Sequence, residues 1–226
     1  MNKKSIILIG AILLVVITIA FFIPQKSANE ELLGINYNVK GNTADFKYET
    51  ENPVVAMHIE DYGSIVMELY PDIAPNTVNN FISLIKDGFY DNNTMHRLMK
   101  DFVLQGGDPT GTGGGGPGYT INGEFTNNGF ENNLSHEKWI VSMARKQDDY
   151  NSAGSQFFIC LEDSTFLDGD YAAFGKVIDG FNIIEKIAQE ENVSDSNTGK
   201  LSNNLMIEKA LIDLQGKKYK KVIKND

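Results

Sequence analysis

Cysteine, histidine and basic residues are scarce in this chain of 226 residues, and each shortage excludes a class of function. A single cysteine, Cys160, excludes an internal disulfide, so the core alone must hold the fold. Cys160 lies in an apolar segment with no histidine nearby in the sequence, which favours buried packing over a nucleophilic role. The three histidines lack metal-ligand spacing, so we expect neither a metal nor another cofactor.

Acidic residues outnumber basic ones, 30 to 20, which gives a formal net charge of −10. Without Lys3 and Lys4, which precede an apolar segment, the balance is 18 basic residues against 30 acidic ones, or −12. A surface with this charge argues against nucleic acid as a partner and against adhesion to anionic lipid.

One long apolar run, from Ser5 to Ile23, stands at the N-terminus. As a helix these 19 residues would span about 28 Å, close to the hydrocarbon thickness of a bilayer. Lysines precede the run and no acidic residue occurs before Glu30, so the positive-inside rule predicts a cytoplasmic N-terminus and an external remainder. We expect residues 1–23 to form a single-pass anchor in the cell membrane.

Cleavage of this segment as a signal peptide is the alternative, and it would make the protein secreted. The apolar run is longer than the 7–15 residues typical of a signal peptide. The candidate cleavage site before residue 29 carries Lys26 where a small residue belongs. Both observations favour a retained anchor.

Residues 24–52 are polar and mixed, and predict a juxtamembrane spacer from which Phe46 and Tyr48 are candidates to pack on the domain. From residue 53 the pattern changes. Apolar residues alternate over 55–59 and 65–69 around a turn, which predicts a β-hairpin. A helix is predicted from Pro75 to a stop at Gly88, with one apolar face formed by Val78, Phe81, Ile82 and Ile85.

The rest of the domain, which we place at residues 53–216, consists mostly of short predicted strands. These lie around residues 102–104, 140–144, 156–160, 172–177 and 206–214, with a second amphipathic helix around residues 183–188. Many short strands and few helices favour a closed antiparallel barrel or a sandwich. Residues 217–226 predict a basic, solvated tail. The glycine cluster over residues 111–118 lacks the lysine of a phosphate-binding loop, and predicts a flexible loop.

Two short segments carry the functional signal. One contains Met95-His96-Arg97 and then Phe-Val-Leu-Gln-Gly-Gly-Asp over residues 102–108; the other is Gly-Ser-Gln-Phe-Phe-Ile over residues 154–159. They resemble the two signature stretches of the cyclophilin family of peptidyl-prolyl cis/trans isomerases, and the likeness extends over about residues 54–216. The resemblance implies a mostly β fold, an eight-stranded antiparallel barrel capped by two α-helices. It also implies isomerase activity on proline-containing unfolded or exported polypeptides.

Within this resemblance Arg97 is the predicted catalytic residue. Rotation about an X-Pro bond meets a barrier of roughly 18–20 kcal/mol, because amide resonance is lost. As the bond twists, the proline nitrogen becomes pyramidal and recovers a lone pair. A donor aimed at that nitrogen stabilises the transition state more than the planar ground state. The permanently charged guanidinium of Arg97 suits this task, whereas a lone arginine would more simply be a surface ion-pair partner.

The resemblance assigns substrate binding to ten further residues. Gln105 and Gln156 would bond the substrate backbone or hold Arg97, and backbone groups at Ala144 and Arg145 would pair with the peptide as an added strand. The others would form an apolar pocket for the proline ring, although the sequence alone does not distinguish a pocket wall from ordinary core: Phe102, Val103, Phe158 and Leu167, with Phe166 and Tyr171 at the rim.

Departures from the family pattern bear on specificity. Phe166 stands where cyclosporin-sensitive members carry tryptophan, which implies weak cyclosporin binding. Val103 stands where methionine is common, and Tyr171 where many members have histidine. A peptide-binding chaperone scaffold with little isomerase activity is the alternative function, but the intact arginine and both glutamines favour catalysis.

Overall fold

The computed structural model describes residues 36–46 and 48–225. The predicted anchor at residues 1–23 lies outside this part of the chain. Within the described residues, no helix has both the length and the apolar character needed to cross a membrane.

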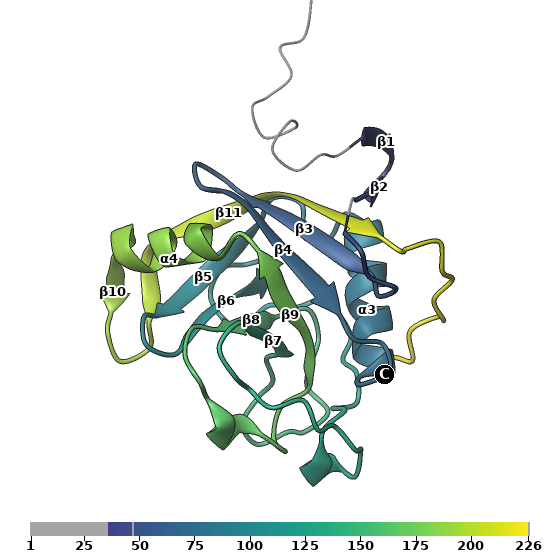
Figure 1. The fold of residues 1–226 in the computed structure, drawn as a ribbon. Coiled ribbons are helices and arrows are strands. Elements are labelled where there is room, and N and C mark those ends of the chain that lie inside the picture. The colour runs from purple at the N-terminus through teal and green to yellow at the C-terminus, as the bar shows by residue number, and fades with distance from the viewer. Residues whose placement is uncertain (1–35, 47, 226) are drawn as a thin grey trace, which may run out of the picture. The chain divides into compact units, whose positions relative to one another are not determined.

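Eight antiparallel strands close into a barrel (Figure 1). In their order around the barrel they are β11 (Lys200–Asp213), β3 (Val54–Ile59), β4 (Gly63–Leu69), β9 (Ala173–Asp179), β7 (Ile140–Met143), β8 (Phe157–Cys160), β6 (Val103–Asp108) and β5 (Asn93–Met99). The last strand, β11, pairs with β3 on one side and with β5 on the other, which closes the circle and leaves neither strand as an open edge. The barrel, rather than the sandwich, is therefore confirmed.

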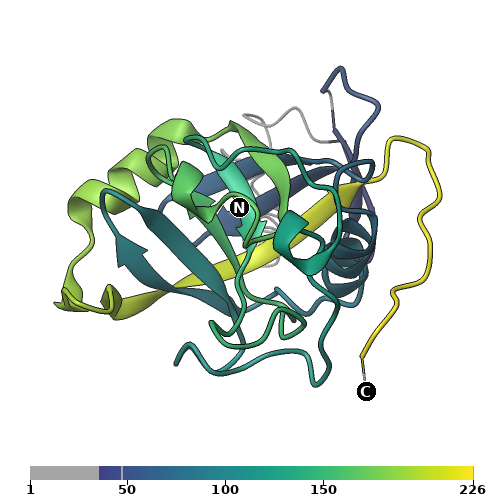
Figure 2. The same ribbon diagram turned by 90° about the horizontal axis from the view of Figure 1, so that it is seen from below.

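Two α-helices, α3 (Pro75–Lys86) and α4 (Phe181–Glu190), lie at opposite sides of the barrel in both views (Figures 1 and 2). Helix α3 begins with proline at its first turn, as predicted. The carboxylate of Glu124 accepts hydrogen bonds from the backbone N–H groups of Asn76 and Thr77, which satisfies two donors that a helix N-terminus leaves unpaired. Two short 3₁₀ helices, η1 (Thr126–Asn128) and η2 (Thr165–Leu167), lie in the loops.

Four strands were not predicted: the barrel strand β5 and three short strands, β1 (Asn36–Lys40), β2 (Thr43–Asp45) and β10 (Val193–Asp195). Strand β2 pairs in parallel with β11. Just after it Phe46 is buried, and the Tyr48 hydroxyl donates to Asp179 at 2.8 Å. The two spacer residues expected to contact the domain therefore do so.

The C-terminal tail runs back past α3 (Figure 2) and is attached to the domain at particular residues rather than solvated along its whole length. Val222 is buried with the core residues. The N–H of Ile223 donates to Oδ1 of Asn76 at 2.8 Å, and the N–H of Asn225 donates to the Thr120 carbonyl at 2.8 Å. These contacts tie the tail to the first turn of α3 and to the loop around residue 120.

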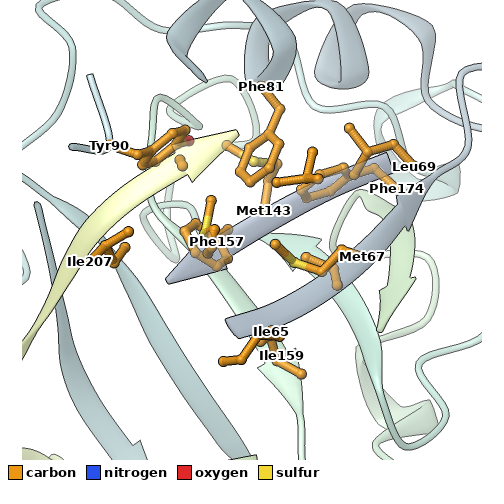
Figure 3. Close-up of a cluster of buried hydrophobic side chains, with 14 of the residues drawn as sticks. Ile65, Met67, Leu69, Phe81, Tyr90, Met143, Phe157, Ile159, Phe174 and Ile207 are labelled. Carbon is orange, nitrogen blue, oxygen red and sulfur yellow. The ribbon is translucent and has the colours of Figure 1, made fainter. Parts of the chain in front are cut away.

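The barrel interior is filled by alternate strand residues and by the apolar face of α3 (Figure 3). Phe81 from α3 packs against three aromatic rings with centroid separations of 5.0–5.3 Å, those of Tyr90, Phe157 and Phe174. Side chains of successive strand residues point to opposite faces. In β8 this sends Phe157 and Ile159 into the interior, whereas Phe158 belongs to a second apolar cluster on the outer face.

Candidate active site

The second apolar cluster forms a cup on the outer face of the barrel. Its buried members are Val103, Phe158, Cys160 and Leu167. Strand pairing assembles it, because Val103 lies opposite Cys160 and Gln105 lies opposite Phe158. The cup opens into a cavity of about 220 Å³ lined by Arg97, Phe102, Val103, Gln105, Ala144, Arg145, Phe158, Leu167 and Tyr171. Nine of the eleven predicted site residues therefore surround one cavity.

The β5–β6 hairpin brings Arg97 to this cup. Arg97 pairs with Gln105, and Met99 pairs with Val103, so the turn between the two strands carries Phe102. The Arg97 guanidinium carbon lies 6.0 Å from the centre of the Phe102 ring. Residues that are five and six positions apart in sequence thus meet at one site because the chain reverses between them.

Three acceptors hold the half-buried guanidinium of Arg97. Its Nε donates to the Thr198 carbonyl at 2.7 Å, Nη1 to Oε1 of Gln105 at 3.0 Å and Nη2 to the sulfur of Met99 at 2.7 Å. Burial lowers the pKa of Arg97, but arginine stays protonated in proteins. No carboxylate in the described part of the chain forms an ion pair with it. The simple alternative of a surface arginine in an ion pair is not what the structure shows.

The two predicted glutamines form a relay behind Arg97. Nε2 of Gln105 donates to Oε1 of Gln156 at 3.0 Å. Nε2 of Gln156 in turn donates to the carbonyls of Gly113 and Gly115, at 3.0 and 2.9 Å. Gln156 therefore connects the side chain that holds Arg97 to the glycine-rich loop.

A buried carboxylate organises that loop, which the sequence predicted to be flexible. Asp108 is fully buried and accepts hydrogen bonds from loop N–H groups, including those of Thr110 at 2.7 Å and Gly113 at 2.6 Å. Burial acts to raise its pKa, but the hydrogen bonds outweigh burial and lower the pKa of Asp108 to about 2. The glycine loop is thus tied to a carboxylate that is ionised at neutral pH.

The remaining predicted residues lie beside the cavity. Gln156 lines a neighbouring cavity of about 650 Å³ that also includes Gln105, Ala144 and Arg145, and the tail residue Asn225 borders it. Phe166 is 71 % exposed and stacks on Phe102 with ring centres 5.5 Å apart, which places it at the rim. The Ala144 N–H donates to the Gln156 carbonyl at 3.0 Å, so a peptide strand would have to pair with other backbone groups of residues 144 and 145.

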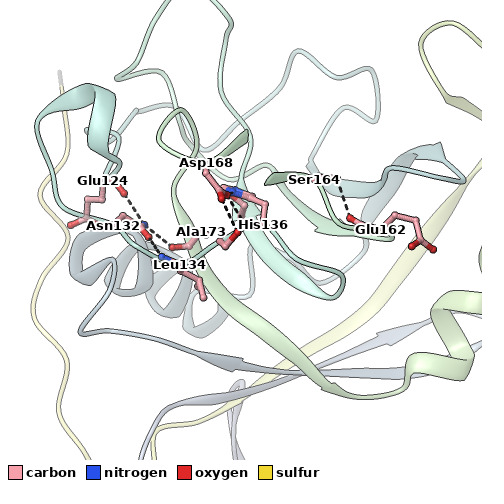
Figure 4. A network of polar contacts seen from close by, with 10 residues as sticks. Glu124, Asn132, Leu134, His136, Glu162, Ser164, Asp168 and Ala173 are labelled. Carbon is pink, nitrogen blue, oxygen red and sulfur yellow. Dashed lines mark hydrogen bonds and ion pairs between the residues drawn. The ribbon is translucent and has the colours of Figure 1, made fainter. Parts of the chain in front are cut away.

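A polar network supports the loop that carries Phe166 and Leu167 (Figure 4). Nδ1 of His136 lies 2.8 Å from Oδ1 of Asp168, and its Nε2 lies 3.0 Å from the Ser142 hydroxyl. The Ser164 N–H donates to the His136 carbonyl at 2.7 Å. Burial lowers the pKa of His136, while Asp168 opposes that shift. The ring thus bridges strand β7 and the segment that contains η2.

Three functional neighbours were missed from the sequence. Thr198 reaches Arg97 through a backbone carbonyl from a loop 101 residues away, which no side-chain pattern could indicate. Met99 lies two residues after Arg97, but no sequence motif indicates that its sulfur accepts a hydrogen bond from the guanidinium. Asp108 belongs to the first signature segment, and the available signal was an acidic residue three positions before the glycine cluster that begins at Gly111.

Comparison with known proteins defines the class. The sequence profile of the cyclophilin type peptidyl-prolyl cis-trans isomerase/CLD family matches residues 54–211. Peptidyl-prolyl cis-trans isomerase B of Bacillus subtilis is 45 % identical over 130 residues, which cover 58 % of this chain and 87 % of that protein. Peptidyl-prolyl cis-trans isomerase-like 1 of Rhizopus delemar is 46 % identical over 126 residues, covering 55 % and 74 % of the two chains.

A crystal structure of a cyclophilin type peptidyl-prolyl cis-trans isomerase from Cryptosporidium parvum matches with a TM-score of 0.63 and 33 % identity, covering 72 % of this chain and 98 % of that one. Relatives in sequence and in structure share one activity, so this protein is a peptidyl-prolyl cis-trans isomerase. It belongs to the cyclophilin family, as its two signature segments implied. The alternative of a peptide-binding scaffold with little isomerase activity is correspondingly disfavoured.

The depressed pKa of Asp108 predicts a specific loss of stability in acid. A carboxylate whose pKa is lower in the folded than in the unfolded state stabilises the fold above its unfolded pKa, and this stabilisation disappears as the pH falls through the folded pKa. The shift from 3.8 to about 2 corresponds to about 2 kcal/mol. The free-energy gap between wild type and Asp108→Asn should therefore shrink by about this amount between pH 5 and pH 2.

Urea denaturation followed by fluorescence of Trp139, the single tryptophan, measures this gap. A gap that stays constant over the whole pH range would show that the charge of Asp108 does not stabilise the fold.

Proposed function

We propose that Arg97 is the catalytic residue and that it donates a hydrogen bond to the proline nitrogen as this atom becomes pyramidal. The observation that carries the proposal is the position of the guanidinium, which is held by neutral acceptors at the wall of a cavity with an apolar cluster on its floor. A cation without a carboxylate partner keeps its donor strength for the substrate. A preorganised donor of this kind needs no reorganisation when the amide twists.

The cavity suits a proline ring, because Phe102, Val103, Phe158 and Leu167 supply an apolar part of its wall. The related Cryptosporidium parvum enzyme has also been solved in the presence of the dipeptide Ala-Pro. We infer that this protein likewise binds proline-containing polypeptides, with the proline in the cup and the guanidinium beside the amide.

Replacing Arg97 by alanine should lower kcat/KM on an X-Pro peptide by about 10²–10³-fold, which corresponds to losing one preorganised donor worth about 2.7–4 kcal/mol. Binding of the ground-state peptide should change much less, since the donor acts mainly on the twisted amide. Arg97→Lys should restore only part of the activity, because a point charge lacks the planar fork. A proline-isomerisation assay, with circular dichroism to verify the fold, tests this. A folded Arg97→Ala protein that retains more than half its activity would remove the assigned mechanism.

We infer that cyclosporin binds weakly. Phe166 is exposed at the rim, where it offers an aromatic face but no N–H donor. Phe166→Trp should therefore tighten cyclosporin binding, because an indole adds both contact area and a donor. Titration calorimetry on the two proteins measures the difference, with Ile223→Trp as a control at an equally exposed residue of the tail. Equal affinity in wild type and Phe166→Trp would place the determinant elsewhere.

We further propose that the enzyme acts outside the cell on exported polypeptides, anchored by residues 5–23. The support is the uncharged run preceded by lysines. The protein should stay with membranes after carbonate extraction, and external protease should release the isomerase domain from intact spheroplasts. Full activity in the soluble fraction, with a new N-terminus near Ala28, would instead establish a cleaved and secreted form.

A further inference from the structure

We propose that Asp108 is a positioning residue for Arg97, and that it acts through the glycine loop and the two glutamines. The inference rests on the proposed catalytic role of Arg97. It goes further in assigning the orientation of the guanidinium to a carboxylate that lines neither cavity described above.

The first step is the set of hydrogen bonds by which Asp108 holds the glycine loop. Oδ1 accepts from the Thr110 N–H at 2.7 Å and the Thr110 hydroxyl at 2.8 Å, while Oδ2 accepts from the N–H groups of Thr112 at 3.1 Å and Gly113 at 2.6 Å. Every one of these neighbours donates. A carboxylate, which only accepts, therefore matches the site, whereas an asparagine would turn two N–H donors toward other donors.

The conformation of the loop depends on these hydrogen bonds because its own side chains contribute little packing. It contains four consecutive glycines over residues 113–116, and three of these four are exposed. A methyl group at Gly115 would collide with Oδ1 of Asp108, so backbone and carboxylate are in close approach there. One further tether is the Asn204 amide, which donates to the Gly111 carbonyl at 3.2 Å.

The second step is the direction of the hydrogen bonds that lead from the loop to Arg97. The loop carbonyls at residues 113 and 115 accept hydrogen bonds from the NH₂ group of Gln156. The side-chain oxygen of Gln156 is then free to accept a hydrogen bond from the NH₂ group of Gln105, and the side-chain oxygen of Gln105 accepts one from Arg97. Each amide has one accepting and one donating end, so the orientation of one fixes the next. If the carbonyls move away, both amides can turn over, and Gln105 would then present donors to a cation.

A double-mutant cycle tests this connection, because only coupled residues show non-additive effects. Asp108→Asn should lower kcat for an Ala-Pro-containing peptide about 10-fold, less than Arg97→Ala because the guanidinium is retained, with KM changed less than twofold. Gln156→Leu removes the middle link and keeps a similar side-chain volume. In that background Asp108→Asn should cost less than about twofold further. Exchange NMR on the peptide separates kcat from KM.

Asp213→Asn is the matched control. Asp213 is also a buried carboxylate that accepts hydrogen bonds from backbone N–H groups, those of Phe46 and Gln215, but among the described residues no hydrogen bond joins it to Arg97. It should lose stability without losing kcat. If Asp108→Asn fails to fold, Gly115→Ala displaces the same carboxylate from the loop side and should lower kcat in the same way.

Two results would overturn the inference: an unchanged kcat in folded Asp108→Asn, or an equal loss in the presence and absence of Gln156. Either result with an inactive Arg97→Ala protein removes only the role of Asp108. An active Arg97→Ala protein removes the proposed role of Arg97 itself, so the two failures are distinguishable.

Discussion

Successive side chains of a strand point to opposite faces of the barrel wall, and the site depends on this alternation. In β8, Phe157 and Ile159 fill the interior while Phe158 and Cys160 form the outer cup. In β6, Leu104 points inward and Val103 outward. Each of these strands therefore contributes side chains both to the core and to the pocket. A shift of its register by one residue would exchange the inward-pointing and the outward-pointing side chains. The hydrogen bonds between β6 and β8, which form part of the barrel wall, thus also fix the floor of the site.

An uncompensated cation in a strongly acidic protein requires a particular environment. Around Arg97 the protein supplies a backbone carbonyl, an amide oxygen and a sulfur, which orient the guanidinium without neutralising it. A negative charge lies beyond the two glutamines, on the carboxylate of Asp108, which accepts hydrogen bonds from loop N–H groups. Separating the two charges by two neutral amides allows the anion to order the surroundings of the cation without pairing with it.

The sequence predicted those features whose physical cause is local. The alternation at residues 55–69 gave the β3–β4 hairpin, and the spacing of Val78, Phe81, Ile82 and Ile85 gave α3. The barrel and the cup came from the resemblance, since neither the closure by β11 nor the outward direction of Phe158 has a local signal. Contacts through backbone atoms, such as the Thr198 carbonyl on Arg97, could not be predicted from side-chain identity. The docked tail was missed because one buried residue, Val222, among lysines gives no periodic pattern.

Cys160 has a consequence outside catalysis. It is the single cysteine of the chain, fully buried behind the pocket, and burial raises the pKa of its thiol to about 12. A thiol reagent needs the thiolate and physical access, and the closed structure provides neither. Labelling can proceed only when β8 and its neighbouring strands separate. The labelling rate therefore measures how often the pocket wall opens, and not the rate of catalysis. The native chain thus carries its own probe for the opening of the cup, with no residue added or removed.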